Sequence, residues 1–185
     1  MMFSLLSFQN AFSQQIPKVV SSTDIKRAAV AIILSPKKEM FMIRRATVAG
    51  DPWSGHMAFP GGRFEQTDKN LRETAERETF EEVGVDLRAT TTFLGRLNDL
   101  EHPKLIVSAY VYWLNEMVSF TLDPKEVAQL YSFPLEQLVE QGNRTTIQRT
   151  FAGTNYTFPA IHLLDAEIWG ISLQFIDDLL HKIEA

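Results

Sequence analysis

The segment from Arg77 to Glu82 carries the side chains most able to do chemistry. It holds one arginine and three glutamates, Glu78, Glu81 and Glu82, within six residues. At about 100° per residue of a helix, Glu78 and Glu82 fall on one face and Glu81 lies beside them. That face also carries the stripe expected to meet the core, formed by Leu71, Ala75 and Thr79.

A solvated run of charge is the usual explanation of a glutamate-rich helix. It fits poorly here, because Glu78 and Glu82 continue the core-facing stripe instead of opposing it. Carboxylates gathered on a partly buried face repel one another and lose hydration. A divalent cation would relieve both costs, and a set of oxygen ligands suits Mg²⁺ or Mn²⁺. Arg77 lies four residues before Glu81, so it is expected to pair with that carboxylate.

The composition limits the classes of function. The 185 residues predict one domain, and 18 basic against 23 acidic side chains give a net charge of −5. This charge argues against binding to nucleic acid or to an anionic membrane, and no apolar run approaches the length of a membrane span. The absence of cysteine excludes disulfides, thiolate metal sites and a thiol nucleophile. It is compatible with a reducing cytoplasm, which is the expected compartment.

The elements that position these side chains follow from patterning. The acidic helix is expected over residues 70–83, where Asn70 and Glu73 fit a capping box and Gly84 supplies the stop. Apolar runs predict strands, and a hairpin and two further helices are expected toward the end of the chain. The strands are 26–35, 40–44, 56–59, 91–97 and 105–114; the hairpin pairs 144–151 with 156–163; the helices are 134–140 and 167–183.

Strands before and after one central helix, with a second helix at the end, favour an α+β fold on a mixed sheet. Residues 1–25 are expected to form an N-terminal arm or helix, because their apolar stretch lacks the basic start of a signal peptide. Residues 26–185 are expected to form the domain itself.

The acidic segment resembles the Nudix box, G-x5-E-x7-R-E-U-x-E-E-x-G-U, where U is a bulky aliphatic residue. Asp68 stands where the family has its first glutamate, eight residues instead of seven separate it from Arg77, and Thr79 takes an aliphatic position. The match covers Gly62, Arg77, Glu78, Glu81, Glu82, Gly84 and Val85.

Within Nudix hydrolases, the chain is most similar to the coenzyme A pyrophosphatase branch. The similarity lies in Phe59-Pro60-Gly61-Gly62, in the longer loop with Asp68, in Thr74-Ala75 and in Ile168-Trp169-Gly170-Ile171-Ser172. The branch's upstream signature is degenerate here. Arg45-Ala46 and Gly55 align with it, but Gly50 or Asp51 stands where a second arginine belongs. Arg45 remains as a candidate substrate-binding residue, and Asp51 is expected to repel the 3′-phosphate of coenzyme A.

The resemblance implies an α/β/α sandwich around a mixed β-sheet, and hydrolysis of a nucleoside diphosphate linked to another moiety. Glu78 and Glu82 would be the main ligands of Mg²⁺ or Mn²⁺, and Glu81 a third ligand or the group that activates water. Arg77 would orient these carboxylates. Gly61 and Gly62 would let the backbone approach the cation and the pyrophosphate, where a Cβ would intrude.

Two further assignments are expected around this site. Family members often take an additional carboxylate from outside the box, and Glu126 and Glu101 are both candidates. Trp53 could stack on a base, or it could simply pack its loop onto the body. His56 and His102 are expected to be ordinary loop histidines.

Several functions stay open within this frame. The substrate, a small nucleotide derivative, could be coenzyme A or a derivative, a sugar nucleotide, ADP-ribose or a dinucleotide. A non-catalytic Nudix-fold binding module is the alternative from another class. Such modules usually lose one helix carboxylate, and all three are present here. A homodimer is left open as the assembly.

Overall fold

The computed structural model describes residues 3–14, 16–21, 25–102, 104–151 and 153–184. Within them, eight strands form a mixed sheet whose continuous path runs β3-β2-β1-β7-β5, with β4 on β1, β6 on β7 and β8 on β2. The two central strands, β1 (Lys26–Leu34) and β7 (Leu105–Leu114), run parallel and are almost wholly buried. The others are β2 (Glu39–Arg45), β3 (Met57–Ala58), β4 (Gly61–Arg63), β5 (Thr91–Arg96), β6 (Leu100–His102) and β8 (Val127–Pro134).

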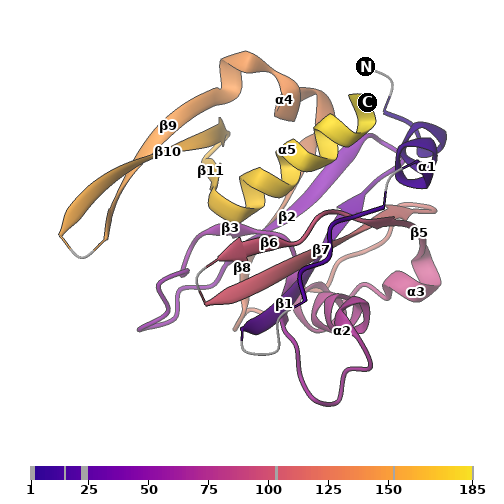
Figure 1. The fold of residues 1–185 in the computed structure, drawn as a ribbon, viewed down its shortest axis with the longest axis horizontal. Helices are drawn as coiled ribbons and strands as arrows, with labels where there is room; N and C mark the ends of the chain where they lie inside the picture. Colours follow the sequence, from indigo (N-terminus) through magenta and orange to yellow (C-terminus); the bar gives the residue numbers. More distant parts are fainter. Residues whose placement is uncertain (1–2, 15, 22–24, 103, 152, 185) are drawn as a thin grey trace.

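Helix α2 (Leu71–Val83) covers one face of this sheet, followed by the short α3 (Leu87–Thr90) (Figure 1). Its start is the expected one, because the side chain of Asn70 accepts the N–H of Glu73 at 3.1 Å. The reciprocal half of the capping box is absent: the Glu73 carboxylate accepts the N–H of Lys69 instead. The helix ends at Gly84, whose φ of 72° is the left-handed conformation that glycine adopts at low cost.

The opposite face is covered by α5 (Gly170–Glu184) and α1 (Leu5–Ser13). Phe8 of α1 is fully buried in the same hydrophobic core as Phe175 and Leu179 of α5. A second core lies under α2 and includes Ala75 and Val83. The expected mixed sheet between two helical layers is confirmed, and the N-terminal segment forms a helix packed on the body.

A smaller sheet of β9 (Arg144–Phe151), β10 (Thr154–Leu163) and β11 (Ala166–Trp169) stands beside the main one. The hairpin over β9 and β10 is confirmed. The helix expected from residue 167 is wrong at its start. Ala166–Trp169 alternates between buried and exposed and pairs with β10, and the helix begins only at Gly170, with φ +62°.

The segments before β9 also differ in part from the expectations. Helix α4 (Leu135–Val139) lies inside the expected 134–140 segment and is followed by the 3-10 turn Gln141–Asn143. Strand β8 was not predicted from the sequence, yet it pairs with the whole length of β2. No helix in the described ranges is long and apolar enough to cross a membrane.

Candidate active site

The three glutamates of the acidic segment occupy different depths on helix α2. Glu82 is buried, with 1% of its surface exposed. The Glu78 side chain is 14% exposed and that of Glu81 53% exposed. We call this surface, formed by Glu78, Glu81 and Glu82, the Glu82 face. The helix packs on β1 and β4, and Glu78 and Glu82 lie against residues 62 and 61.

Glu82 is held by the backbone instead of by a cation. The N–H of Gly61 donates to its Oε2 at 2.8 Å, and among the described residues no arginine or lysine forms an ion pair with it. Burial raises the pKa of Glu82 to about 8, a cost that the Gly61 hydrogen bond only partly offsets. A Cβ on Gly61 would lie 2.3 Å from the carbonyl oxygen of Ala29, and its φ is +150°. Glycine is therefore required where β4 approaches Glu82.

Gly62 makes the corresponding contact with Glu78. A Cβ at this position would lie 2.3 Å from the carboxyl carbon of Glu78. Burial raises the pKa of Glu78, and the adjacent Arg77 guanidinium, 3.1 Å away, lowers it. Gly62 thus gives the Glu78 carboxylate room, whereas Gly61 lets β4 approach β1 and donate its N–H to Glu82.

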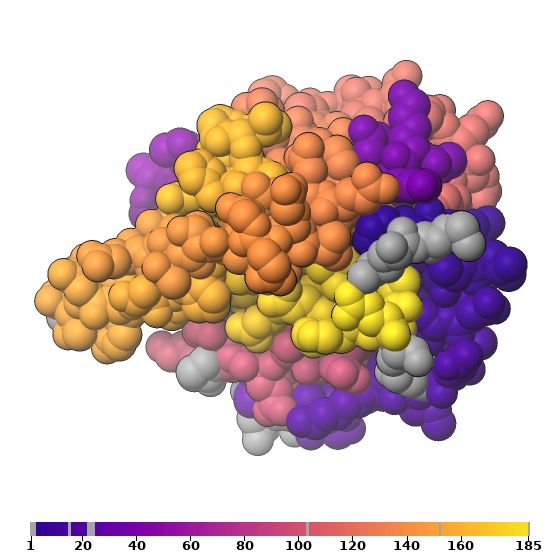
Figure 2. All heavy atoms as spheres, turned by 90° about the horizontal axis from the view of Figure 1, so that it is seen from above, coloured from indigo at the N-terminus to yellow at the C-terminus, as the bar shows by residue number. Residues whose placement is uncertain are grey.

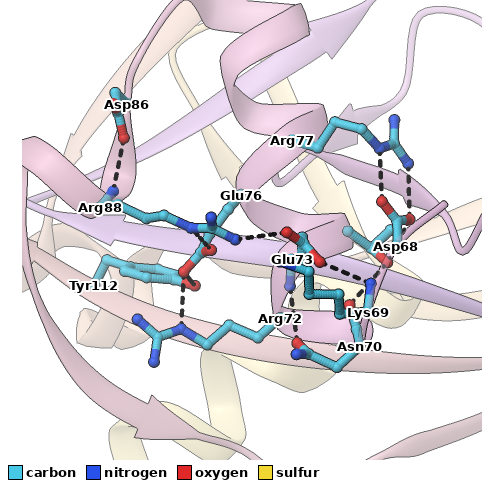
Figure 3. Close-up of polar contacts among 11 residues, drawn as sticks. Asp68, Lys69, Asn70, Arg72, Glu73, Glu76, Arg77, Asp86, Arg88 and Tyr112 are labelled. Carbon is cyan, nitrogen blue, oxygen red and sulfur yellow. Dashed lines mark hydrogen bonds and ion pairs between the residues drawn. The ribbon is translucent and has the colours of Figure 1, made fainter.

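Arg77 joins the acidic groups around it. Its Nε and Nη2 donate to the two carboxylate oxygens of Asp68 at 3.0 and 3.1 Å (Figure 3). Its Nη1 lies 2.9 Å from Glu81, the predicted pair, and also contacts Glu78. The hydrogen bonds from Arg77 hold the pKa of Asp68 down at about 2 and raise the pKa of the arginine. A two-pronged contact of this kind fixes the guanidinium plane.

Asp68 is a site residue whose role the sequence analysis did not identify. Its side chain is 3% exposed and also accepts the hydroxyl of Thr74 at 2.9 Å and the N–H of Glu65 at 3.0 Å. The signal was present, because Asp68 occupies the position of the first glutamate of the Nudix box. The shorter side chain on a longer loop still reaches Arg77.

The structure separates the two candidates for an additional carboxylate. Glu126, exposed at the start of β8, contributes its charge to raising the pKa of both Glu78 and Glu82. Glu101 lies on β6 and pairs with Lys18 at 3.7 Å, and it is not among the main charges acting on either glutamate. Of the two candidates, Glu126 is therefore the one whose charge acts on Glu78 and Glu82.

The loop between β2 and β3 places the candidate substrate-binding residues. Arg45 Nη2 donates to Asp51 at 3.1 Å, and the N–H of Trp53 donates to the other oxygen of Asp51 at 3.0 Å. The charge of Arg45 also lowers the pKa of Glu82, so Arg45 lies close to the Glu82 face. Trp53 is 46% exposed, with its ring 5.7 Å from that of His56. The expected repulsion from Asp51 is thus reduced, because Arg45 already neutralises it.

The two histidines lie apart. His56 is half-buried between the rings of Trp53 and Trp169, and burial lowers its pKa. His102 is exposed on β6. Neither acts as a partner of the helix glutamates in the contacts of the described residues.

The donor chemistry of the Glu82 face fits a hard divalent cation. Carboxylates are its only ionisable donors, and among the described residues no cationic side chain forms an ion pair with the buried Glu82. Across the described residues, no three histidine or acidic side chains already converge as a coordination shell. Arg77 draws Glu81 and Glu78 toward itself. A bound ion would therefore need these side chains to turn away from Arg77.

Helix α2 also carries a second acidic cluster that the sequence analysis missed. Glu76 is buried, and it accepts hydrogen bonds from Arg72 at 2.8 Å, from Tyr112 at 3.2 Å and from Arg88 (Figure 3). Arg88 also donates to Glu73. We call these five residues the Glu76 network. The spacing of Arg72 and Glu76 was a signal for their pairing, but only the fold brings Arg88 and Tyr112 to them.

Comparisons with known proteins agree on one family. The model of the NUDIX domain matches residues 24–152. An uncharacterised protein of Schizosaccharomyces pombe is 33% identical over 171 residues, which cover 78% of this chain and 52% of that protein. The chain thus spans about half the length of this relative. An uncharacterised Nudix hydrolase NudL of Photorhabdus laumondii is 28% identical over 99% of this chain and 100% of its own.

Solved structures share the fold at low sequence identity. A MutT/nudix family protein of Enterococcus faecalis has a TM-score of 0.59 at 14% identity and covers all of this chain and 76% of its own. The NUDIX domain of Shewanella oneidensis NrtR, solved with ADP ribose, has a TM-score of 0.56 at 14% identity, over 94% of this chain and 97% of its own. The box residues, the sheet between two helical layers and the matching family model agree. This chain belongs to the Nudix family.

Proposed function

We propose that this chain is a pyrophosphohydrolase that depends on Mg²⁺ or Mn²⁺ and cleaves a nucleoside diphosphate linked to another moiety. The observation that carries the proposal is Glu82, a buried carboxyl group beside Glu78 with one backbone donor and no ion-pair partner among the described residues. Burying an unpaired carboxylate is costly, so a chain that keeps one has a use for its charge.

In this proposal Glu78 and Glu82 hold the cation, with Glu81 as a further ligand or as the group that takes a proton from the attacking water. Glu126 is the additional carboxylate. When bound, a divalent cation neutralises the pyrophosphate and polarises its oxygens. Hydrolysis adds one water across the P–O–P linkage and releases two phosphorylated fragments.

The remaining residues position these groups. Arg77, fixed by Asp68, orients Glu78 and Glu81. Gly62 leaves room for the Glu78 carboxylate, and the N–H of Gly61 holds Glu82. Arg45 and Trp53 lie at the neighbouring loop, where they would contact the substrate outside the reacting phosphates.

The finer proposal is that coenzyme A or a derivative is the substrate. It is supported by the branch-like sequence around the box, and the Arg45–Asp51 pair bears on it directly. Arg45 is engaged and no second arginine follows it in the loop, so a weak preference for the 3′-phosphate of coenzyme A is expected. ADP-ribose, sugar nucleotides and dinucleotides are the alternative substrates.

The test is a panel of these compounds assayed with Mg²⁺, with Mn²⁺ and with excess EDTA, using Glu82→Gln as the blank. We expect turnover of at least one compound, only with metal, and a ratio of kcat/KM for coenzyme A over 3′-dephospho-coenzyme A below about ten, since a lost charge-assisted contact is worth up to a hundredfold. A ratio well above ten would mean that another residue reads the 3′-phosphate. Binding of a compound without turnover, unaffected by Glu82→Gln, would favour the binding module.

A further inference from the structure

A row of aromatic rings runs from the loop between β2 and β3 onto the hairpin of β9 and β10. The hairpin projects from the body as a two-stranded ribbon (Figures 1 and 2), and the loop extends toward the same side of the molecule (Figure 1). Neighbouring rings have centroids 5.2–6.3 Å apart. We call this set the ring row; in spatial order it consists of Trp53, His56, Trp169, Phe158, Tyr156 and Phe151.

The two parts of the ring row meet at His56. Its ring lies 5.2 Å from that of Trp169 at the end of β11, and β11 packs on β3. Burial lowers the pKa of His56, and the charges of Arg149 on β9 and of Arg45 lower it further. Arg45 is also among the charges that act on Glu82. The ring row therefore begins beside the Glu82 face and leads away from it along the small sheet.

The hairpin part of the ring row occupies one face of the small sheet. Tyr156, Phe158 and Ala160 alternate along β10, and Ala160 pairs with Trp169 of β11. Since successive residues of a strand point to opposite sides, the three rings share a face. The reverse face carries exposed polar side chains, those of Gln148, Thr150, Asn155 and Thr157. The ribbon is thus aromatic on one side and polar on the other.

The charges of the hairpin are few, and they are paired. Residues 144–163 contain two arginines, no lysine and no acidic residue. Arg149 pairs with Glu167 at 2.7 Å, and Arg144 pairs with Asp177 at 2.7 Å. A charged group would need an unpaired ion of opposite sign, and the described part of the hairpin offers none. The hairpin part of the ring row therefore suits an uncharged group.

The length and exposure of the ring row indicate the shape of that group. Its two ends are open to solvent, with Trp53 46%, Tyr156 49% and Phe151 45% exposed. A sugar is held by hydrogen-bonding side chains, and a nucleobase stacks on one or two rings. A flexible chain can instead contact each ring in turn and lose contact with water along its length.

We propose that the ring row binds the second moiety of the substrate, and that this moiety is a long, uncharged, flexible chain attached to the diphosphate. The inference rests on the proposed pyrophosphohydrolase function and names the class of substrate at that site. The Glu82 face takes the diphosphate, and the chain runs from Trp53 past Trp169 toward Tyr156. Sugar nucleotides and ADP-ribose lack such a chain, so they are expected to be poorer substrates.

The test uses adenosine diphosphate alkyl esters with ethyl, hexyl and dodecyl groups, assayed with Mg²⁺. KM should fall by at least about tenfold from the ethyl to the dodecyl ester, because each methylene removed from water adds affinity. Tyr156→Ser/Phe158→Ser removes two rings of the row, and the ratio of the two KM values should fall below about threefold. The matched control is Gln148→Ser/Thr157→Ser, a cross-strand pair on the reverse face, which should keep the ratio of the unchanged protein.

Circular dichroism and Tm show whether each variant is folded. Phe158 is half-buried, so Tyr156→Ser alone is the second variant if the double variant does not fold. Its side chain is half exposed, so little core is lost, and the ratio of KM values should still fall by about threefold.

Calorimetric titration of Glu82→Gln with the same esters separates this proposal from the proposed reaction. Binding that strengthens with chain length, without turnover of any ester by the unchanged protein, would support the ring row and contradict the hydrolysis. Affinity that does not depend on chain length, or a dependence that Tyr156→Ser/Phe158→Ser keeps, would overturn the ring row and leave the hydrolysis untouched. A dinucleotide that binds more tightly than the dodecyl ester, and loses this advantage in the same variant, would also overturn it, because the rings would then stack on a base.

Discussion

Helix α2 presents glutamates to two surroundings, the Glu76 network and the Glu82 face. Glu76 and Glu82 are both buried and stand six residues apart on one helix. Glu76 receives hydrogen bonds from two arginines and a tyrosine, so its charge is compensated within the protein. Glu82 receives one backbone N–H, and burial raises its pKa to about 8. A compensated carboxylate stabilises the fold, whereas an uncompensated one calls for an external cation.

The difference in neighbours explains this contrast. Arg72 lies one turn before Glu76 on the exposed flank of the helix, and Arg88 of α3 reaches the same carboxylate. On the other flank, Arg77 is engaged by Asp68, Glu78 and Glu81 and does not reach Glu82. Beside Glu82, one arginine therefore forms ion pairs with three carboxylates, those of Asp68, Glu78 and Glu81. Two arginines form ion pairs with the single carboxylate of Glu76.

Removal of metal is the largest expected perturbation of this comparison. Chelation with excess EDTA should reduce turnover to background, since the Glu82 face holds carboxylates and lacks a lysine-rich phosphate clamp. The Glu76 network should be unaffected, so Tm should not fall by more than a few degrees. Activity that survives complete stripping of the metal would break the comparison.

Substitution of the uncompensated carboxylate comes next. Glu82→Gln should keep the fold and lower kcat by roughly 10²–10⁴, as expected for the loss of a metal ligand or a positioned base. Without metal the variant should match or exceed the unchanged protein in stability near neutral pH, because the cost of burying an ionisable carboxyl is removed. Steady-state kinetics and thermal unfolding measure the two effects. Glu78→Gln and Glu82→Gln that both keep near-normal turnover would place the site elsewhere.

The matched substitution in the Glu76 network is Glu76→Gln. It leaves Arg72 and Arg88 facing a neutral amide, so the free energy of unfolding should fall by about 2 kcal/mol. The residue makes no contact with the Glu82 face, and kcat should therefore change by less than about threefold. Urea unfolding and kinetics on the same sample decide this, and a large loss of kcat at unchanged stability would contradict it.

In metal-free protein, the pH dependence of the free energy of unfolding should differ between a paired carboxylate, Asp68, and the unpaired Glu82. The folded-state pKa of Asp68 is lowered to about 2, so its contribution is present above pH 4 and is lost as the pH falls toward 2. The folded-state pKa of Glu82 is raised to about 8. Its contribution to the free energy of unfolding is fully present below pH 4.5 and is lost as the pH rises through 8. At about 1.4 kcal/mol per pH unit, each effect amounts to a few kcal/mol.

Urea unfolding between pH 2 and pH 9 measures both losses. Glu82→Gln should flatten the alkaline side and leave the acid side unchanged. An alkaline loss that persists in this variant would mean that Glu82 is not its source.

The smallest expected effect concerns the loop beside the Glu82 face. Asp51→Asn keeps the acceptor for the Trp53 N–H but removes the ion pair that engages Arg45. Freeing Arg45 should lower KM for an anionic substrate by about 3–10-fold, which is less than the full strength of one charge-assisted hydrogen bond. The value of kcat should stay within about twofold. A rise in KM of similar size would show instead that the Asp51 contact is needed to position Arg45.

The local patterns in the sequence were sufficient for many elements. Strand β7 and helix α2 have the predicted bounds to within a residue, because a long apolar run and a capped helix are determined by neighbouring residues. The start of α5 was not predictable in this way. Ala166–Trp169 continues the apolar spacing of the helix, and only its pairing with β10 makes it a strand.

The sequence by itself determined the chemistry of the site: three glutamates on a helical turn, Arg77 beside them and two glycines ahead. The tertiary structure decided which of these charges are compensated. Arg88 pairs with Glu76 from α3 and Glu126 acts on Glu82 through its charge, and neither interaction can be deduced from spacing along the helix. Charges interact through space and in proportion to burial, and both are properties of the folded chain.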